Sequence, residues 1–163
     1  MLSKKTCLAG MLALAASLTV LAAPARGPGA SGTALGLFLG QPTGITFRYG
    51  LDKAQSLEAK AAWDFAAKDG ASVSVQANWL LEFPGILVIE KEDFPLYVGA
   101  GLQLGVGTTT SLGFRIPAGV LYRFGKAPIE LCLELGLGMQ LFPSTALLGS
   151  GGLGVRYRFN SAD

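Results

Sequence analysis

Several residue types are scarce in this chain of 163 residues, and each scarcity excludes a class of function. Histidine is absent, which excludes the usual serine and cysteine hydrolases, because their nucleophile depends on a neighbouring imidazole base. Charged residues make up only 15% of the chain, against roughly 25% in typical soluble domains. The net charge is +2 and no basic run occurs, so the electrostatic footprint of a nucleic-acid-binding protein is missing.

Cysteine is also scarce, with Cys7 and Cys132 as the two thiols. Cys7 precedes an apolar run of 16 residues, Leu8–Ala23, which follows two lysines. A charged start, a short apolar stretch and small residues near its end are typical of a secretory signal, so we predict that residues 1–25 are cleaved. The alternative is a membrane-anchoring helix, for which the run is short. A lipoprotein is excluded because Cys7 lies before the run, and without Cys7 no internal disulfide can form.

The rest of the chain has no further apolar run long enough for a transmembrane helix. It has alternation instead. Between Ile129 and Leu141 each odd position is large and apolar, whereas the even positions are polar or small. Successive side chains of a strand point to opposite faces, so this pattern predicts a strand. Eight such segments, separated by turn-forming residues, are expected at 34–40, 45–51, 56–65, 71–83, 94–106, 112–124, 129–142 and 151–159.

The predicted organisation is a single all-β domain over residues 34–159. It follows the signal 1–25 and a flexible segment, 26–33, and it precedes a short tail, 160–163. The longest irregular stretch, 84–93, contains an apolar run, Ile-Leu-Val-Ile. This run predicts either an extension of a strand or a small turn that contacts a membrane.

The two faces of the eight segments differ in charge. One face carries no charged residue, whereas the other collects glycines, small polar residues and ten charges. These ten are Arg48, Glu58, Lys60, Asp64, Arg115, Arg123, Glu130, Glu134, Arg156 and Arg158. An eight-stranded antiparallel up-and-down β-barrel fits this alternation in two ways. In a soluble barrel the apolar face fills the core, and in an outer-membrane barrel it meets lipid while the polar face lines the interior.

Two features favour the transmembrane barrel. Its glycine-rich polar face is a poor soluble surface but suits a narrow interior. Outward aromatic residues also gather where the even-numbered segments end, which predicts the aromatic girdle of a membrane barrel. They are Tyr49, Phe83, Tyr122, Phe124, Tyr157 and Phe159.

The C-terminal segment resembles the assembly signal of outer-membrane barrels, with Gly154, Tyr157 and the terminal aromatic Phe159 in the matching places. Four residues follow Phe159, which departs from that pattern. Further segments, among them GQPTGI, FPLYVG, RIPAG and APIE, resemble those of a family of small bacterial outer-membrane proteins. The eight-stranded domain of outer membrane protein A is the usual template for that family. The resemblance implies a bacterial outer-membrane location, with membrane lipid and the barrel-assembly machinery as partners.

The inward residues do not indicate catalysis or metal binding. Glu130, Cys132 and Glu134 share a face, but buried carboxylates usually balance cations, and Cys132 has no imidazole to activate it. The acidic residues are too sparse to predict a metal site. We therefore expect a monomer that is not an enzyme and binds no cofactor. Three functions stay open: a structural or anchoring barrel with a closed interior, a narrow pore or small-ligand passage, and a surface adhesin or receptor.

Symmetric pairing about the tight turns predicts specific ion pairs. Arg123 is expected opposite Glu130, and Arg48 opposite Glu58. Glu134 is expected within reach of Arg156 or Arg158, because the last segment returns along the same strand. A slip of two residues would exchange partners but keep the face.

Overall fold

The computed structural model describes residues 32–64, 72–107 and 109–159. These residues form ten β-strands and no helix. The strands are β1 (Gly32–Gln41), β2 (Thr43–Gly50), β3 (Gln55–Asp64), β4 (Ser72–Phe83), β5 (Val88–Ile89), β6 (Glu92–Asp93), β7 (Leu96–Val106), β8 (Ser111–Arg123), β9 (Ile129–Phe142) and β10 (Ala146–Phe159). Within this part of the chain, no helix has the length and apolarity needed to cross a membrane.

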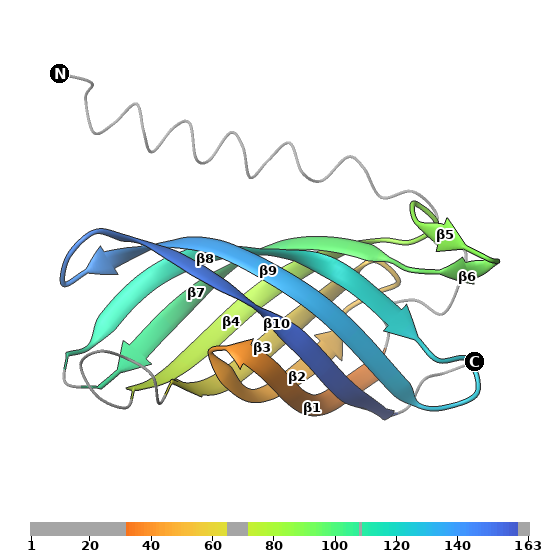
Figure 1. Cartoon of the computed structure of the whole chain (residues 1–163), viewed down its shortest axis with the longest axis horizontal. Helices are drawn as coiled ribbons and strands as arrows, with labels where there is room; N and C mark the ends of the chain where they lie inside the picture. The colour runs from red at the N-terminus through yellow and green to blue at the C-terminus, as the bar shows by residue number, and fades with distance from the viewer. Residues whose placement is uncertain (1–31, 65–71, 108, 160–163) are drawn as a thin grey trace, which may run out of the picture.

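Eight of the strands close into an antiparallel barrel, as predicted (Figure 1). Their order around the wall is β1-β10-β9-β8-β7-β4-β3-β2. Each barrel strand therefore pairs with the next barrel strand along the chain, and β1 closes the wall against β10. Closure leaves no strand edge unpaired, which removes the usual site of edge-to-edge aggregation. The remaining strands, β5 and β6, form a separate hairpin between β4 and β7.

The strand boundaries agree with the expected segments to within two residues, except at the start of β10. β10 begins at Ala146, five residues before the expected start, and pairs with β9 along that extension. The expected segment begins at 151, but pairing with β9 holds residues 146–150 extended as well. β1 begins at Gly32, two residues early. The predicted signal 1–25 and tail 160–163 lie outside the described residues.

The two faces of the wall have the predicted polarity. At the described strand positions that point outward no charged residue occurs, and large apolar side chains there are exposed, such as Leu135 at 72% and Leu137 at 67%. The inward positions hold the buried polar and charged side chains. The buried apolar cluster is small and consists of Leu80, Tyr97, Leu121 and Cys132. The barrel is thus polar inside and apolar outside.

Outward aromatic side chains contact one another in pairs where β8 and β10 finish. Tyr157 and Phe159 contact each other edge to face, with ring centroids 4.9 Å apart. Tyr122 and Phe124 make a similar contact at 4.8 Å. Because antiparallel even-numbered barrel strands end on one side, these contacts lie at the same end of the barrel, as the sequence predicted.

Residues 84–95 connect β4 to β7 at this same end. The chain makes a hairpin of its own, with Val88 opposite Asp93 and Ile89 opposite Glu92. Of the two predictions for this stretch, extension of a barrel strand is therefore wrong. In Figure 1 the hairpin projects from the wall at the right-hand end of the barrel, the end at which β10 also finishes on the other side.

Candidate functional site

Ion-paired side chains fill the barrel interior near the end where β10 finishes. Arg48 of β2 lies between two carboxylates, 2.5 Å from Glu82 Oε1 and 2.6 Å from Glu130 Oε2. Arg123 of β8 contacts the same two carboxylates, at 2.5 and 2.9 Å. The four side chains come from β2, β4, β8 and β9 and close a ring across the barrel. Each charge in this ring has two partners of opposite sign.

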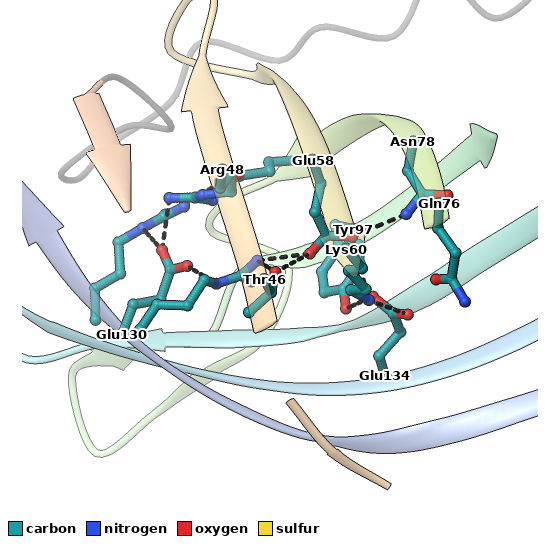
Figure 2. A network of polar contacts seen from close by, with 12 residues as sticks. Thr46, Arg48, Glu58, Lys60, Gln76, Asn78, Tyr97, Glu130 and Glu134 are labelled. Atoms are coloured by element: carbon teal, nitrogen blue, oxygen red, sulfur yellow. Dashed lines mark hydrogen bonds and ion pairs between the residues drawn. The ribbon is translucent and has the colours of Figure 1, made fainter. Parts of the chain in front are cut away.

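Arg156 of β10 connects the ring to the middle of the barrel. Its Nε lies 3.0 Å from Glu130 Oε1, and its Nη1 lies 2.6 Å from Glu58 Oε1. Glu58 also accepts hydrogen bonds from Asn78 Nδ2 at 3.0 Å and from the Thr46 hydroxyl at 3.3 Å (Figure 2). Side chains of β2, β4 and β10 therefore converge on the buried carboxylate of Glu58 on β3.

Glu134 of β9 is the centre of the third group. Its Oε1 lies 2.6 Å from Lys60 Nζ and 2.9 Å from Arg115 Nη2, and the Tyr97 hydroxyl donates to its Oε2 at 2.8 Å. Lys60 Nζ is also 3.2 Å from Glu58 Oε2, so this group is joined to the one before it. The ion pairs thus form a single connected network along the barrel axis.

All members of this network are buried. Each is at most 7% exposed: Arg48, Lys60, Arg115, Arg123 and Arg156 against Glu58, Glu82, Glu130 and Glu134. A charge removed from water costs several kcal/mol unless partners compensate. Here each of the nine has a partner of opposite charge within 3.2 Å. The near balance of five cations and four anions is what makes a filled interior tolerable.

Eight of the ten charges predicted to face inward belong to the network. Arg158 follows Arg156 on β10 and is half-buried. Asp64 ends β3, and its side chain lies outside what the structure describes. The predicted interior is therefore confirmed for its central part.

Of the three predicted partnerships, two have the predicted register, and one of these two is also an ion pair. Arg123 lies opposite Glu130 and pairs with it. Arg48 does lie opposite Glu58, but its guanidinium contacts the two ring carboxylates, and Glu58 pairs with Arg156 and Lys60.

The third prediction, Glu134 with Arg156 or Arg158, is wrong for Arg156. Register places Gly152 opposite Glu134 and Arg156 opposite Glu130. Four residues along a strand span roughly 13 Å, which is too far for that pair. No contact between Glu134 and Arg158 is seen among the described interactions, in which Glu134 binds Lys60, Arg115 and Tyr97.

Two members of the site were missed from the sequence, Glu82 and Tyr97. Both stand at inward positions, since Leu81 and Phe83 flank Glu82 and the apolar Leu96 and Val98 flank Tyr97. The alternation of inward and outward positions, applied to the whole of each strand, predicts that both side chains point inward. Glu82 supplies the second carboxylate of the ring, so its omission also hid why Arg48 turns away from Glu58.

Glycine on the inward face makes room for the network. Gly36 of β1 lies opposite Arg156, and a Cβ at this position would come within 2.5 Å of the Arg156 Cα. A Cβ at Gly154 would overlap the Sγ of Cys132. The small residues that the sequence shows on this face therefore permit close strands and large charged side chains in one narrow barrel.

A cavity of about 340 Å³ opens at the opposite end of the barrel. Arg115 forms its floor and donates hydrogen bonds to Gln76 and, at 3.0 Å, to Ser150 Oγ. Below it, the gap between Lys60, Gln76 and their neighbours has no volume for a water molecule. The cavity is a vestibule that stops at the charged network.

Neither a metal centre nor a nucleophile is assembled by these residues. Among residues 32–64, 72–107 and 109–159, no group of three or more metal-ligating side chains converges. Cys132 is a buried free thiol packed with Leu80, Tyr97 and Leu121. The arrangement holds nine buried charges in fixed pairs across the barrel interior.

Comparison of the chain with known protein families, with curated proteins and with solved structures finds no match.

Proposed function

We propose that this protein is a structural or anchoring β-barrel of the bacterial outer membrane with a closed interior. The observation that supports this most is its inverted polarity, with nine paired charges inside and an uncharged apolar belt outside. Soluble monomers rarely expose contiguous apolar patches beyond a few hundred Å². A belt around the whole barrel is the surface expected of a protein solvated by lipid.

The dimensions of the wall also support a membrane location. A strand tilted by about 45° needs roughly 9–11 residues to cross the hydrocarbon layer. Seven of the eight barrel strands have 10 to 14 residues, and β2 has eight. The aromatic contacts at one end match the level of a membrane interface.

The network explains why such a barrel would serve as a rigid anchor. It draws side chains from every barrel strand except β1 among the described residues. Ion pairs between strands that are distant in the chain fix the barrel's cross-section. A filled interior contributes mechanical stability, whereas it hinders the transport that a wide pore provides.

A charged substitution on the belt tests the membrane location. In Leu135→Arg, a cation replaces the side chain of a 72% exposed residue. At the midplane of a bilayer this costs about 2–4 kcal/mol, so we expect less folded protein in the outer-membrane fraction. The matched control is Thr110→Arg, in the exposed connection between β7 and β8.

Heat-dependent gel mobility of the full chain expressed in a two-membrane bacterium measures folding in both variants. If Leu135→Arg folds as well as Thr110→Arg and the protein is recovered in the soluble periplasmic fraction, the belt faces water and the proposal fails. A β-rich circular dichroism spectrum alone does not decide the question, because a soluble barrel has one too.

The second candidate is a narrow passage for a small ligand, which the vestibule favours. It is polar in part, with Ser74, Gln103, Ser111 and Ser150 among its lining residues. Passage would require the network below Arg115 to rearrange. Large, stable conductance in planar-bilayer recordings would favour the passage over the closed barrel, for which we expect rare and small openings at most.

A further inference from the structure

The hairpin formed by β5 and β6 has an unusual surface for an exposed connection. Four consecutive apolar residues run through its first arm, with Ile86 at 65%, Val88 at 55% and Ile89 at 52% exposed. Leu87, between them, is 37% exposed. The turn and second arm carry the charges, in the sequence Glu-Lys-Glu-Asp at positions 90–93. One arm is therefore apolar and the other is charged.

This hairpin is folded and not a loose loop. Glu90 and Lys91 both have positive φ, at 51° and 75°, as a two-residue turn of type I′ requires. Asp93 Oδ1 accepts a hydrogen bond from the Gly85 amide at 2.9 Å, and the Phe94 amide donates to the Leu87 carbonyl at 2.8 Å. The backbone thus holds the apolar arm in a fixed, exposed position.

An aromatic contact fixes the base of the hairpin to the outside of the wall. Phe94 stacks on Tyr122 with ring centroids 4.9 Å apart and planes 23° apart. Tyr122 points outward from β8 and contacts Phe124. The amide of Leu121 also donates to the Pro95 carbonyl at 2.8 Å. The base of the hairpin is therefore held against Tyr122 at the edge of the apolar belt, and the apolar arm lies at this end of the barrel.

We propose that the apolar arm, residues 86–89, inserts into the lipid leaflet at the end of the barrel where β10 finishes. This inference rests on the proposed function, because it assumes that the belt lies in a bilayer. Burial of apolar surface favours insertion by roughly 25 cal/mol per Å². The charged turn and second arm stay at the headgroups, as the polar parts of interfacial segments do. The inserted hairpin then sets the depth and tilt of the barrel in the membrane.

An environment-sensitive fluorophore on the hairpin tests this. The dye, NBD, is attached to Val88→Cys in the full chain carrying Cys7→Ser and Cys132→Ser, and the labelled protein is then folded into phosphatidylcholine vesicles. We expect blue-shifted emission at position 88. We also expect strongest quenching by spin labels near the top of the acyl chains, about 5–10 Å below the headgroup surface. The matched hairpin control is Glu92→Cys, for which we expect weaker quenching.

Two reference positions separate the possible failures. Leu135→Cys reports on the belt and should be quenched by spin labels deep in the bilayer, whereas Thr110→Cys at the other end should be quenched by aqueous iodide. If the spin-labelled lipids quench the dye at position 135 but not at position 88, insertion of the hairpin is refuted and the membrane barrel stands. If neither is quenched, the proposed function fails. Blue-shifted emission at 88 without lipid quenching means that protein covers the arm, which also overturns the inference.

Discussion

The two ends of the barrel interior are built differently. Near the end where β10 finishes, Arg48, Arg123, Glu82 and Glu130 form a closed ring of ion pairs. Near the opposite end, Arg115 is the floor of a vestibule of about 340 Å³ whose lining includes small residues such as Gly105 and Ser111. The same wall thus encloses a packed half and an open half.

The difference shows that the size of the inward side chains decides whether a narrow barrel is filled. Long charged side chains fill the packed half because each finds two partners there. Toward the vestibule the inward positions include Ser74, Gly105, Ser111 and Gly138, which leave volume that larger side chains would occupy. The structure therefore predicts that equal substitutions have unequal effects in the two halves.

The largest effect is expected from Glu130→Leu in the packed half. Glu130 is fully buried and contacts Arg48, Arg123 and Arg156, so its loss leaves three cations short of a partner. Removing one member of a buried pair costs on the order of 3–5 kcal/mol. Urea unfolding in lipid vesicles measures the free energy, with Glu92→Gln in the exposed hairpin as control at about 0.5 kcal/mol or less.

A double-mutant cycle with Arg123→Leu then isolates the pair. Residues in one network couple by about 0.5–3 kcal/mol, and the contact of 2.9 Å places this pair in that class. A coupling energy of zero would show that water screens the two charges, and that the ring does not stabilise the barrel.

The sequence predicts those parts of this ring that depend on residues close together in the chain. Alternation within a strand depends on neighbouring residues, so the eight segments, their closure into a barrel and the inward position of Arg48, Glu130 and Arg156 follow from it. Pairing across one tight turn is local too, which is why Arg123 with Glu130 is confirmed.

Contacts between distant strands do not follow from alternation. Strand tilt and shear decide which inward side chains reach the same height in a barrel, and no local pattern encodes them. Arg48 and Glu130 are 82 residues apart in the chain and still in contact. The predicted start of β10 is wrong for another reason, since Gly149 and Ser150 suit a turn as well as a closely paired strand.

A smaller effect is expected from glycine substitutions that compare the two halves. In Gly36→Ala the new Cβ meets backbone, the Cα of Arg156 at 2.5 Å and the Val155 carbonyl oxygen, so β1 and β10 must separate. Overpacking of this kind costs about 1–3 kcal/mol.

The matched control for this substitution is Gly105→Ala in the vestibule, where the nearest atoms all belong to the Ser111 side chain. That hydroxyl can rotate into the cavity, so we expect a much smaller loss in the same urea assay. Equal losses in the two variants would contradict the distinction between a packed and an open half.

The smallest effect is expected from Arg115→Leu at the vestibule floor. Glu134 keeps Lys60 at 2.6 Å and the Tyr97 hydroxyl at 2.8 Å when Arg115 is removed, so no charge is left without a partner. We therefore expect a loss of about 1–2 kcal/mol, since Gln76 and Ser150 lose the hydrogen bonds that Arg115 donates but no charge is stranded. Conductance in planar bilayers should also stay unchanged, because the ring around Glu130 still blocks the interior. If Arg115→Leu opens a stable conducting path, Arg115 is the gate, and the packed half is not the part that closes the barrel.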